Sequence, residues 1–448
     1  MKKATASSRI TALVCLCLTL LILPLFLTSC EKEMLPKEQL LANTEALDPA
    51  DTNRDYVGLY LDDLGYSGFD KLKFRRIELY FRSYYVQELP SVATLAKNTS
   101  LYFLENLYDD TDTNDKKLLT DALIKSYVSA TGDKYAFYRN EVEYEDYESD
   151  MSGSFVGIGV TVQNPEGNII TVIGITPGSG AETAGIQVGD IICSVDGTSV
   201  DEVGFESLVN MIRGEIGTFV KVTVKRGEEL LDFNVERKQL VEATVSYDID
   251  EDLIAYVQIT RFKANTADQF GEVMAALTEA GAKGIIFDLR GNPGGYLDSV
   301  VDVLEYFVPK ETRIVSYKFG TEDETVFYAE DDNVIHLPIT VLCNEYTASA
   351  GELFTAALRD FREWGLVNVR IVGTTTYKKG VMQNTFTFQD NSALTMTVAY
   401  YNPPSNVNYD GVGVVPDVVV ELPQEAQTDL QLEAAYEEIV RMIASSKH

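Results

Sequence analysis

The sequence predicts a multidomain α+β protein, and three observations support this fold class. The chain has 448 residues, too many for one ordinary core. Hydrophobic residues make up 45% of it, which is enough to fill about three domains. Helical, β-rich and alternating patterns then follow one another along the chain. We therefore expect an N-terminal helical region, a β-rich domain and an α/β core.

A basic and then apolar segment opens the chain. Lys2, Lys3 and Arg9 precede an apolar run over 10–27, which ends in "LTSC" at Cys30. This segment resembles the signal peptide and lipobox of bacterial lipoproteins. The resemblance implies removal of residues 1–29 and a lipid anchor on Cys30, with the rest of the chain outside the cytoplasm in the bacterial cell envelope. A plain transmembrane anchor is the alternative.

The next segments predict a tether and then a helical domain. Residues 30–54 are polar and are expected to form the tether, whereas residues 55–150 contain few glycines and the helical runs "FRRIELYFRSYYVQEL" and "KKLLTDALIKSYVSA". The fragment "DTDTNDKKLLTD" loosely resembles a calcium loop, but Asp115 replaces its sharp-turn glycine. Capping of a helix by Asn114 or Asp115 is the favoured interpretation.

Residues 151–238 predict short strands separated by glycine turns, as in "FVGIGVTV" and "SGAETAGIQVGDIICSVDGTSV". In this order the motifs resemble a PDZ domain, which binds protein C-termini at a strand edge below a loop of backbone amides. An adapter that binds only its own chain is the alternative. The resemblance implies these peptide-binding residues: Gly157, Ile158, Gly159, Val160, Leu208 and Ile212.

Residues 239–425 alternate between strand and helix patterns. "LIAYVQITRF" predicts a strand, "TADQFGEVMAALTEAG" an amphipathic helix, and "KGIIFDLRGNPGGYLDSVVDVLEYF" a buried strand, a glycine turn and a second helix. Such alternation is typical of an α/β core. Residues 426–448 predict a C-terminal helix.

The stretch "NEYTASAGELFTAAL" allows two interpretations of Ser349. Ser349 and Glu352 have the spacing of a capping box, and apolar residues follow at helical spacing. Taken alone, this pattern favours a serine that caps a helix. A nucleophilic serine at the same helix start is the alternative.

Four motifs of the core resemble one peptidase family. They are "GIIFDLRGNPGG", "NEYTASAGELFTAALRD", "GTTTYKKGVMQ" and "YYNPPSNVNYDGVGVVPDVVVELP". In this order and behind a PDZ domain, they are similar to the carboxyl-terminal processing, or tail-specific, peptidases of family S41. The resemblance implies that Ser349 is the nucleophile, Lys379 the general base and Gln383 the residue that supports the lysine.

The assignment of the base depends on the register near "YKKG". Lys379 and Gln383 lie four positions apart, so on a strand their side chains share a face. A register slipped by one residue would make Lys378 the base. The sequence has two histidines, of which only His336 lies within the core. A lysine base must be neutral to accept a proton, so the resemblance requires a dry pocket that lowers the pKa of Lys379.

Backbone amides are the expected donors to the oxyanion. Ala350 starts the predicted helix, and Gly294 and Gly295 form a turn in which main-chain groups can approach a substrate closely. These three residues form the predicted oxyanion hole. The resemblance implies no metal and no other cofactor.

The charge balance limits the partners. With 69 acidic and 37 basic residues, the chain would be repelled by nucleic acid and by an anionic lipid surface. The expected partners are protein or peptide substrates, recognised by their C-termini, and the membrane through the N-terminal lipid. The sequence does not decide whether the chain forms a homo-oligomer. Cys193 and Cys343 sit in apolar runs and are expected to be separate thiols rather than a disulfide.

Two functions follow from these patterns. The first is a membrane-tethered serine endopeptidase whose PDZ domain holds or senses protein C-termini. The second is a PDZ-bearing, peptide-binding lipoprotein whose peptidase core has lost its activity. The serine, lysine, glutamine and double glycine together favour the first.

Overall fold

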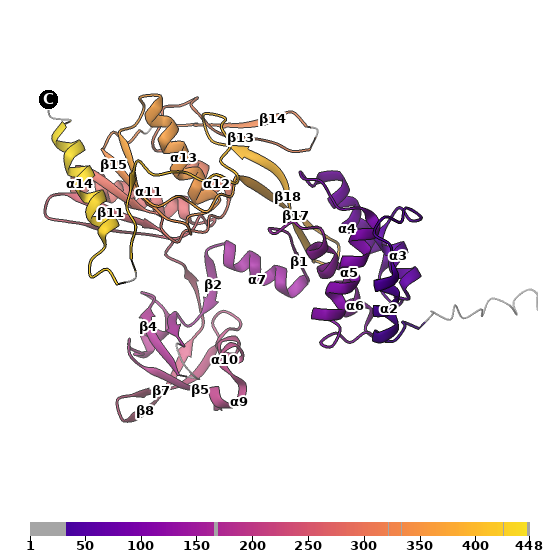
Figure 1. Ribbon diagram of the computed structural model, residues 1–448. Coiled ribbons are helices and arrows are strands. Elements are labelled where there is room, and N and C mark those ends of the chain that lie inside the picture. Colours follow the sequence, from indigo (N-terminus) through magenta and orange to yellow (C-terminus); the bar gives the residue numbers. More distant parts are fainter. Residues whose placement is uncertain (1–32, 165–168, 321, 333, 424, 446–448) are drawn as a thin grey trace, which may run out of the picture. The chain divides into compact units, whose positions relative to one another are not determined.

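The chain folds into two compact units (Figure 1). A computed structural model describes residues 33–445 apart from 165–168, 321, 333 and 424. The first unit contains the described residues up to Asn140 together with Gln383–Thr397, and the second contains Glu141–Met382 and the chain from Val398 onward. The predicted lipidation site Cys30 lies outside the described residues.

The first unit is built around helices, as the sequence predicts. Asp70 and Asp115 each accept hydrogen bonds from two backbone N–H groups of the first turn that follows them, so they act as N-caps. The helices bury aromatic residues such as Phe74 and Tyr127, whose rings meet edge to face. The helices are α2 (Lys37–Ala46), α3 (Val57–Leu64), α4 (Lys71–Tyr84), α5 (Val92–Asn106) and α6 (Lys116–Ala130).

The predicted tether is partly wrong. Within 30–54, residues Lys37–Ala46 form the helix α2, and Leu40 and Thr44 on this helix are fully buried. The hydroxyl of Thr44 lies 2.6 Å from that of Ser100 on α5. The polar composition of the segment concealed this helix because only one narrow stripe of it is buried.

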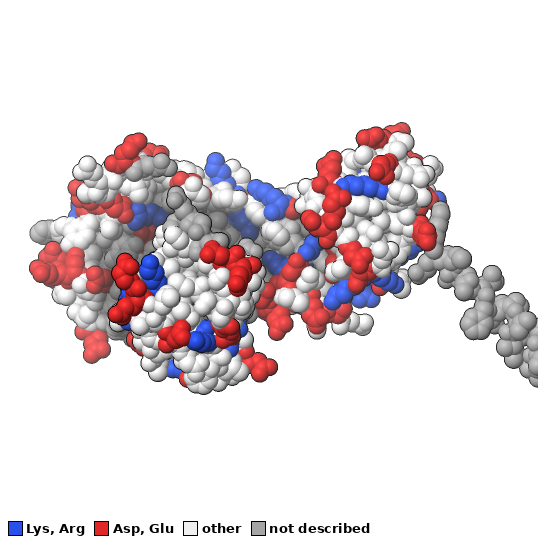
Figure 2. Space-filling view, turned by 90° about the horizontal axis from the view of Figure 1, so that it is seen from below, with Lys and Arg blue, Asp and Glu red and all other residues white. Residues whose placement is uncertain are grey.

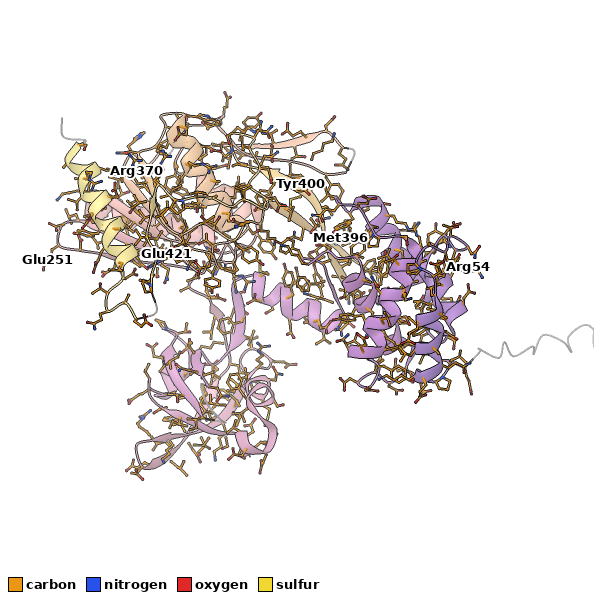
Figure 3. The ribbon with its side chains drawn as sticks, in the orientation of Figure 1. Arg54, Glu251, Arg370, Met396, Tyr400 and Glu421 are labelled. Atoms are coloured by element: carbon orange, nitrogen blue, oxygen red, sulfur yellow. The ribbon has the colours of Figure 1, made fainter. Side chains whose placement is uncertain are left out.

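Two strands from late in the chain complete the first unit. β1 (Phe137–Arg139) pairs antiparallel with the first residues of β18 (Ala393–Asn402). The ring of Phe386, on β17 (Val381–Thr387), lies 4.6 Å from that of Tyr80 on α4. Met396, labelled in Figure 3, is fully buried on β18. These apolar contacts tie 383–397 to the helices, although the sequence places the segment within the run of the core.

The β-rich domain of the second unit has a sheet of antiparallel strands. Its order is β3, β4, β5, β7 and β8, with β6 paired to β5, so β3 is an edge strand. One apolar core underlies the sheet and its helices. The strands are β3 (Val160–Gln163), β4 (Ile170–Ile175), β5 (Ile191–Val195), β6 (Thr198–Ser199), β7 (Phe219–Arg226) and β8 (Glu229–Glu236), and the helices are α8 (Gly180–Ala184), α9 (Val200–Val203) and α10 (Phe205–Ile212).

The entry and exit of the β-rich domain are held together. β2 (Ser154–Gly157) pairs antiparallel with β9 (Lys238–Val241), just after α7 (Glu141–Met151). Next to this pair, the ammonium of the buried Lys263 lies 2.8 Å from Asp150 and 2.6 Å from Glu242. Because an unpaired buried charge is very costly, these two carboxylates are needed to keep Lys263 in place.

The core is a mostly parallel sheet covered by helices on both faces. Alternate residues point to opposite sides: Ile285 and Phe287 join the cluster of α11, α12 and α13, whereas Ile286 packs with α14. The sheet order is β10 (Val245–Ile249), β11 (Ile254–Ile259), β12 (Gly284–Asp288), β15 (Ile339–Cys343), β16 (Val369–Gly373) and β19 (Val418–Val419), with only β10 antiparallel to its neighbour. The helices are α11 (Thr266–Ala280), α12 (Leu297–Glu305), α13 (Ala350–Glu363) and α14 (Leu430–Ser445).

A smaller group of antiparallel strands completes the core. β13 (Arg313–Lys318) pairs with β14 (Glu324–Tyr328) and with the last residues of β18. The observed mixture of helical, β-rich and α/β parts confirms the predicted fold class.

The surface is strongly acidic. Figure 2 shows acidic side chains scattered over the visible face and outnumbering the basic ones, in line with the net charge of −32. Across the part of the chain that the structure describes, no helix combines the length and apolar character needed to cross a membrane.

A buried carboxylate makes the stability of the first unit depend on pH. Glu78 on α4 is 1% exposed and accepts a 2.6 Å hydrogen bond from the N–H of Val57. Burial raises the pKa of Glu78 from 4.5 to about 7, although the amides of Val57 and Gly58 partly oppose this. Between these two pKa values the native state keeps a proton on Glu78 that the unfolded state has lost, so the free energy of unfolding falls as the pH rises.

We expect Glu78→Gln to remove this loss of stability because an amide does not ionise. As the pH rises from about 5 to about 8, the free energy of unfolding of the variant should increase by up to about 3 kcal/mol relative to that of the wild type. Chemical denaturation followed by circular dichroism measures the difference. Glu105→Gln, at an exposed position on α5, is the control. A gain that is the same at both pH values would contradict the prediction.

Candidate active site

Ser349 lies at the edge of the core sheet where the parallel strands end. It follows β15 and immediately precedes α13, while Gly294 and Gly295 lie in the loop after the neighbouring strand β12. In open α/β sheets, ligands bind at this carboxyl edge. The loops after two adjacent parallel strands therefore bring the predicted nucleophile and the predicted oxyanion turn together.

The backbone of Ser349 is held in a sparsely populated conformation. Its φ is 54° and its ψ is −118°, although serine has a Cβ that normally disfavours positive φ. Such a conformation persists only where the surroundings impose it, and it is frequent at functional sites. The strained turn between β15 and α13 leaves the Ser349 side chain half-buried rather than enclosed.

The capping interpretation of Ser349 is compatible with this geometry. Ser349 is the N-cap of α13, and its backbone N–H donates to the Glu352 carboxylate over 3.0 Å. Glu352 is thus the third residue of the helix and fills the role predicted from the spacing. The structure therefore allows both roles for Ser349, because a hydroxyl in a capping box acts only as an acceptor and keeps its own proton.

Glu352 connects the Ser349 turn with the segment of the two lysines. Its side chain is fully buried. Besides the Ser349 amide, its oxygens accept from the hydroxyl of Thr376 at 2.6 Å, from the N–H of Lys378 at 2.7 Å and from the N–H of Lys379 at 2.8 Å. A single carboxylate thus fixes the main chain of the predicted nucleophile and of the predicted base. The sequence suggested Glu352 only as a capping residue.

Lys378 and Lys379 have different surroundings. The side chain of Lys379 is half-buried, whereas that of Lys378 is exposed and its backbone has a φ of 81°. The predicted strand at Lys379 is wrong, because β17 begins only at Val381. The face shared by Lys379 and Gln383 therefore does not follow from strand alternation. The difference in exposure favours Lys379 over Lys378 as the residue directed toward the protein.

Gln383 belongs to the part of β17 that lies in the first unit. Its side chain is half-buried, and its amide nitrogen donates to the hydroxyl of Thr397 over 3.2 Å. This contact fixes the orientation of Gln383 within its own unit. The supporting role of Gln383 stays a prediction.

Gly294 packs directly on Ser349, and Gly295 packs on Phe262. Gly294 has a φ of 99°, and a Cβ at this position would lie 2.7 Å from the Cβ of Ser349. A Cβ on Gly295 would lie 1.9 Å from the carbonyl oxygen of Phe262. Neither position has room for a side chain.

The amides of this turn do not all remain available as oxyanion donors. The N–H of Gly294 already donates to the side-chain oxygen of Asn292 over 2.8 Å. Asn292 is buried and in turn donates to the carbonyl of Ile259. The prediction of Gly294 as a donor therefore needs correction: it provides space, and the N–H groups of Gly295 and Ala350 remain the candidates.

An ion pair borders this turn. The guanidinium of Arg290 lies 2.6 Å from Asp288 and 2.8 Å from Asp429, and this pairing orders the loop. The pair lines a cavity of about 480 Å³ that also includes Tyr346, three residues before Ser349. Glu421, labelled in Figure 3, forms part of the wall. This polar cavity extends to within three residues of the predicted nucleophile along the chain.

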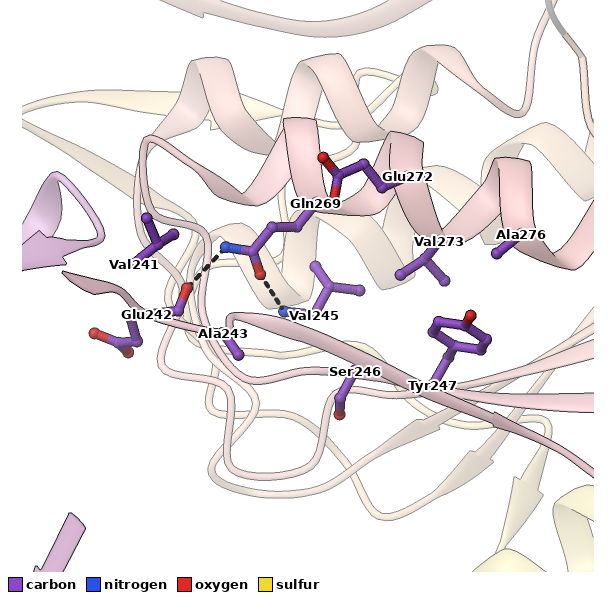
Figure 4. Close-up of a pocket in the computed structure, with 10 residues that line it drawn as sticks. All are labelled: Val241, Glu242, Ala243, Val245, Ser246, Tyr247, Gln269, Glu272, Val273 and Ala276. Carbon is purple, nitrogen blue, oxygen red and sulfur yellow. Dashed lines mark hydrogen bonds between the residues drawn. The ribbon is translucent and has the colours of Figure 1, made fainter. Parts of the chain in front are cut away.

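A second cavity of about 580 Å³ lies between the edge strand β10 and α11 (Figure 4). The side chain of Gln269 spans it, accepting from the N–H of Val245 and donating to the carbonyl of Glu242. Its lining contains none of the predicted catalytic residues. The cavity therefore belongs to the anchoring of the β-rich domain and not to the candidate active site.

The predicted peptide-binding residues of the β-rich domain divide into two groups. Gly157, Ile158 and Gly159 lead into the edge strand β3, which begins at Val160 and leaves one side open for an added strand. Gly159 has a φ of 82° and no room for a Cβ beside Ser179. This arrangement fits a carboxylate-binding loop.

Leu208 and Ile212 on α10 need correction, because both are core residues and Leu208 is fully buried. Phe205 and Val209 are half-buried on the same helix and are better candidates to meet a peptide. Phe205 packs against the same apolar core as Val160 of β3. The spacing of four residues between Phe205 and Val209 places both side chains on one face of the helix, and this spacing was the signal available in the sequence.

The histidine and the two cysteines that the structure describes take no part in this site. His336 is exposed in the segment before β15. Cys193 and Cys343 are free thiols, as predicted, and burial raises the pKa of Cys343 to about 12. Within the described ranges, no group of three or more His, Cys, Asp or Glu side chains could hold a metal ion.

Comparisons with known proteins identify two families in the chain. Residues 253–420 match peptidase family S41, and residues 156–236 match the PDZ domain. The chain is 34% identical over 316 residues to the carboxy-terminal processing protease CtpA of Bacillus subtilis (strain 168), covering 70% of this chain and 66% of the relative.

A "Probable CtpA-like serine protease" of Staphylococcus haemolyticus (strain JCSC1435) is also 34% identical, over 68% of this chain and 61% of the relative. The chain thus spans a little under two thirds of the length of these curated relatives. The solved structure of a candidate S41 protease from Bacteroides fragilis NCTC 9343 has a similar fold, with a TM-score of 0.50 and 16% identity, covering 82% of this chain and 97% of that one. The two family matches lie in the β-rich domain and in the core, and together with the curated relatives they show that the chain belongs to peptidase family S41 and carries a PDZ domain.

Proposed function

We propose that this protein is a serine endopeptidase in which Ser349 is the nucleophile and Lys379 the general base. The observation that carries the proposal is the buried carboxylate of Glu352, which binds the amides of both residues. A purely structural cap would need only the first of these hydrogen bonds. The strained backbone of Ser349 at the carboxyl edge of the sheet adds independent support.

The reaction that this arrangement supports proceeds through an ester of Ser349. Neutral Lys379 takes the hydroxyl proton while the oxygen of Ser349 attacks the peptide carbonyl carbon. The N–H groups of Gly295 and Ala350 are the proposed donors to the oxyanion. The protonated lysine gives its proton to the leaving amine, and water, deprotonated by the same lysine, then hydrolyses the ester. Gln383 is proposed to support Lys379.

The PDZ domain is proposed to bind substrate C-termini. The open edge of β3 offers backbone hydrogen bonds to an extended peptide, and the loop 157–160 offers amides to its carboxylate. Cys30 is proposed to carry a lipid that anchors the protein in the cell envelope. The alternative function is a peptide-binding lipoprotein on an inactive core.

Replacing Ser349 by alanine should abolish cleavage of a partly unfolded protein, measured on gels with the purified soluble region. Loss of a helix cap costs about 1 kcal/mol, whereas loss of a nucleophile lowers the rate by orders of magnitude. The variant should therefore keep its thermal unfolding midpoint within a few degrees. Activity close to that of the wild type would return Ser349 to a capping role.

The two lysines and His336 provide matched controls for the base. Lys379→Ala and Lys379→Arg should both be inactive, because a guanidinium cannot become a neutral base. Lys378→Ala and His336→Ala should keep most of the activity. An inactive Lys378→Ala together with an active Lys379→Ala would move the base by one residue, and an inactive His336→Ala alone would reject the serine-lysine mechanism.

Glu352→Gln should lower kcat by roughly 10- to 100-fold, because an amide nitrogen would then face partly buried backbone donors. The accompanying loss of stability should be about 1–3 kcal/mol for each donor left unpaired. Steady-state kinetics and chemical denaturation measure the two effects. Glu363→Gln is the control, since Glu363 ends the same helix and is 66% exposed. Unchanged kcat in Glu352→Gln would remove Glu352 from the site.

Peptide substrates that end in an amide should be cleaved more slowly than those with a free carboxylate. The amide lacks the charge that the backbone donors of the PDZ loop recognise. Cleavage rates of matched acid and amide peptides provide the measurement, with deletion of residues 156–236 as the control. Equal rates for both peptides would argue against recognition of C-termini.

A further inference from the structure

Two buried tyrosines lie beside the proposed catalytic residues. Tyr401 is on β18 and Tyr409 lies in the loop that follows, and each is 3% exposed. Their rings meet at 80° with centroids 5.9 Å apart. The hydroxyl of Tyr409 donates to that of Tyr401 over 3.0 Å. Neither hydroxyl has a place in the reaction described above.

The hydroxyls of this pair reach the main chain of both proposed catalytic residues. Tyr401 donates to the carbonyl oxygen of Lys379 over 3.1 Å. The hydroxyl of Tyr409 lies 3.4 Å from the carbonyl oxygen of Ser349. Glu352 binds the amides of Ser349 and Lys379, and Tyr401 binds the opposite group of Lys379, its carbonyl.

The base segment 378–380 has a partner for each of its backbone groups. Glu352 and the side chain of Asp410 accept from its amides. Gly411 and Asn408 donate to its first and last carbonyls. The middle carbonyl, that of Lys379, is bound by the phenol of Tyr401. Removal of this phenol would leave the carbonyl of Lys379 without that donor, at the residue whose side chain has to be positioned.

Both phenols keep their protons. Burial raises the pKa of Tyr401, and the hydrogen bond from the hydroxyl of Tyr409 partly lowers it. The phenol oxygen of Tyr401 accepts from Tyr409 while its proton goes to the carbonyl of Lys379. Burial likewise raises the pKa of Tyr409. Both phenols therefore remain protonated and can serve as hydrogen-bond donors at neutral pH.

We propose that Tyr401 and Tyr409 are positioning residues of the hydrolytic site. Tyr401 fixes the main chain of Lys379, and Tyr409, whose hydroxyl lies beside the carbonyl of Ser349, fixes Tyr401. The proposal rests on the proposed function, because it assumes that Lys379 takes the hydroxyl proton of Ser349. It adds two residues that make no step of the reaction themselves.

Phenylalanine at either position tests the proposal, because it keeps the ring and removes only the hydroxyl. We expect Tyr401→Phe to lower kcat by roughly 10- to 100-fold with KM unchanged, since small displacements of reacting groups have effects of this size. Tyr409→Phe should lower kcat by about 3- to 10-fold, as for one neutral hydrogen bond. The double variant should be no slower than Tyr401→Phe, because the two hydroxyls act in series.

Labelling with a fluorophosphonate probe separates positioning from a structural role. The rate constant of labelling of Ser349 should fall in parallel with kcat, while every molecule is still labelled at the end point. A merely structural role would lower the labelled fraction and leave the rate constant of the folded molecules unchanged. Tyr66→Phe is the control, because the buried Tyr66 makes a 2.7 Å hydrogen bond to a hydroxyl, that of Ser100, in the first unit.

Three results would overturn the proposal. They are a Tyr401→Phe variant within about threefold of the wild type, a loss explained by the unlabelled fraction, and a double variant in which the two losses multiply. Ser349→Ala distinguishes this failure from failure of the proposed function. If Ser349→Ala is inactive and Tyr401→Phe is fully active, only the role of the tyrosines is rejected. If Ser349→Ala is active, the proposed function fails as well.

Discussion

The candidate site depends on one buried carboxylate. Glu352 receives hydrogen bonds from two segments that are distant along the chain, and each of these partly buried donors would otherwise lose its partner. The cost of leaving such donors unpaired is what holds the strained turn at Ser349 against the loop of Lys379. The hydrogen bonds to Glu352 therefore both cap α13 and assemble the candidate site.

Much of the fold was predictable because its signals are local. Helical periodicity, glycine turns and the alternation of strands with helices indicated the three kinds of domain, and the family matches confirm the S41 and PDZ predictions. The helix α2 was missed because its buried stripe is narrow. The strand at Lys379 was predicted wrongly because the loop before β17 is fixed by Glu352 and Asp410, which are distant in sequence.

The site was predictable only in part for the same reason. The motifs indicated Ser349, Lys379 and the double glycine, whose roles stay predictions. No pattern indicated that Asn292 would occupy the amide of Gly294, or that Leu208 would be withdrawn into the core of the PDZ domain. Both outcomes depend on packing between segments that lie far apart in the chain. A single sequence does not encode such contacts as a visible spacing.

Part of the chain between Lys379 and Tyr401 belongs to the first unit, and this affects folding and shortened forms of the protein. The segment 383–397 leaves the second unit, packs Phe386 and Met396 within the helical unit, and then returns. The loops of the candidate site can therefore come together only when the segment between them packs on helices that are distant in sequence. Such non-local contacts favour slow folding. A chain shortened to begin at Glu141 would lack β1, and the uncovered edge of β18 would then invite association between molecules through their strands.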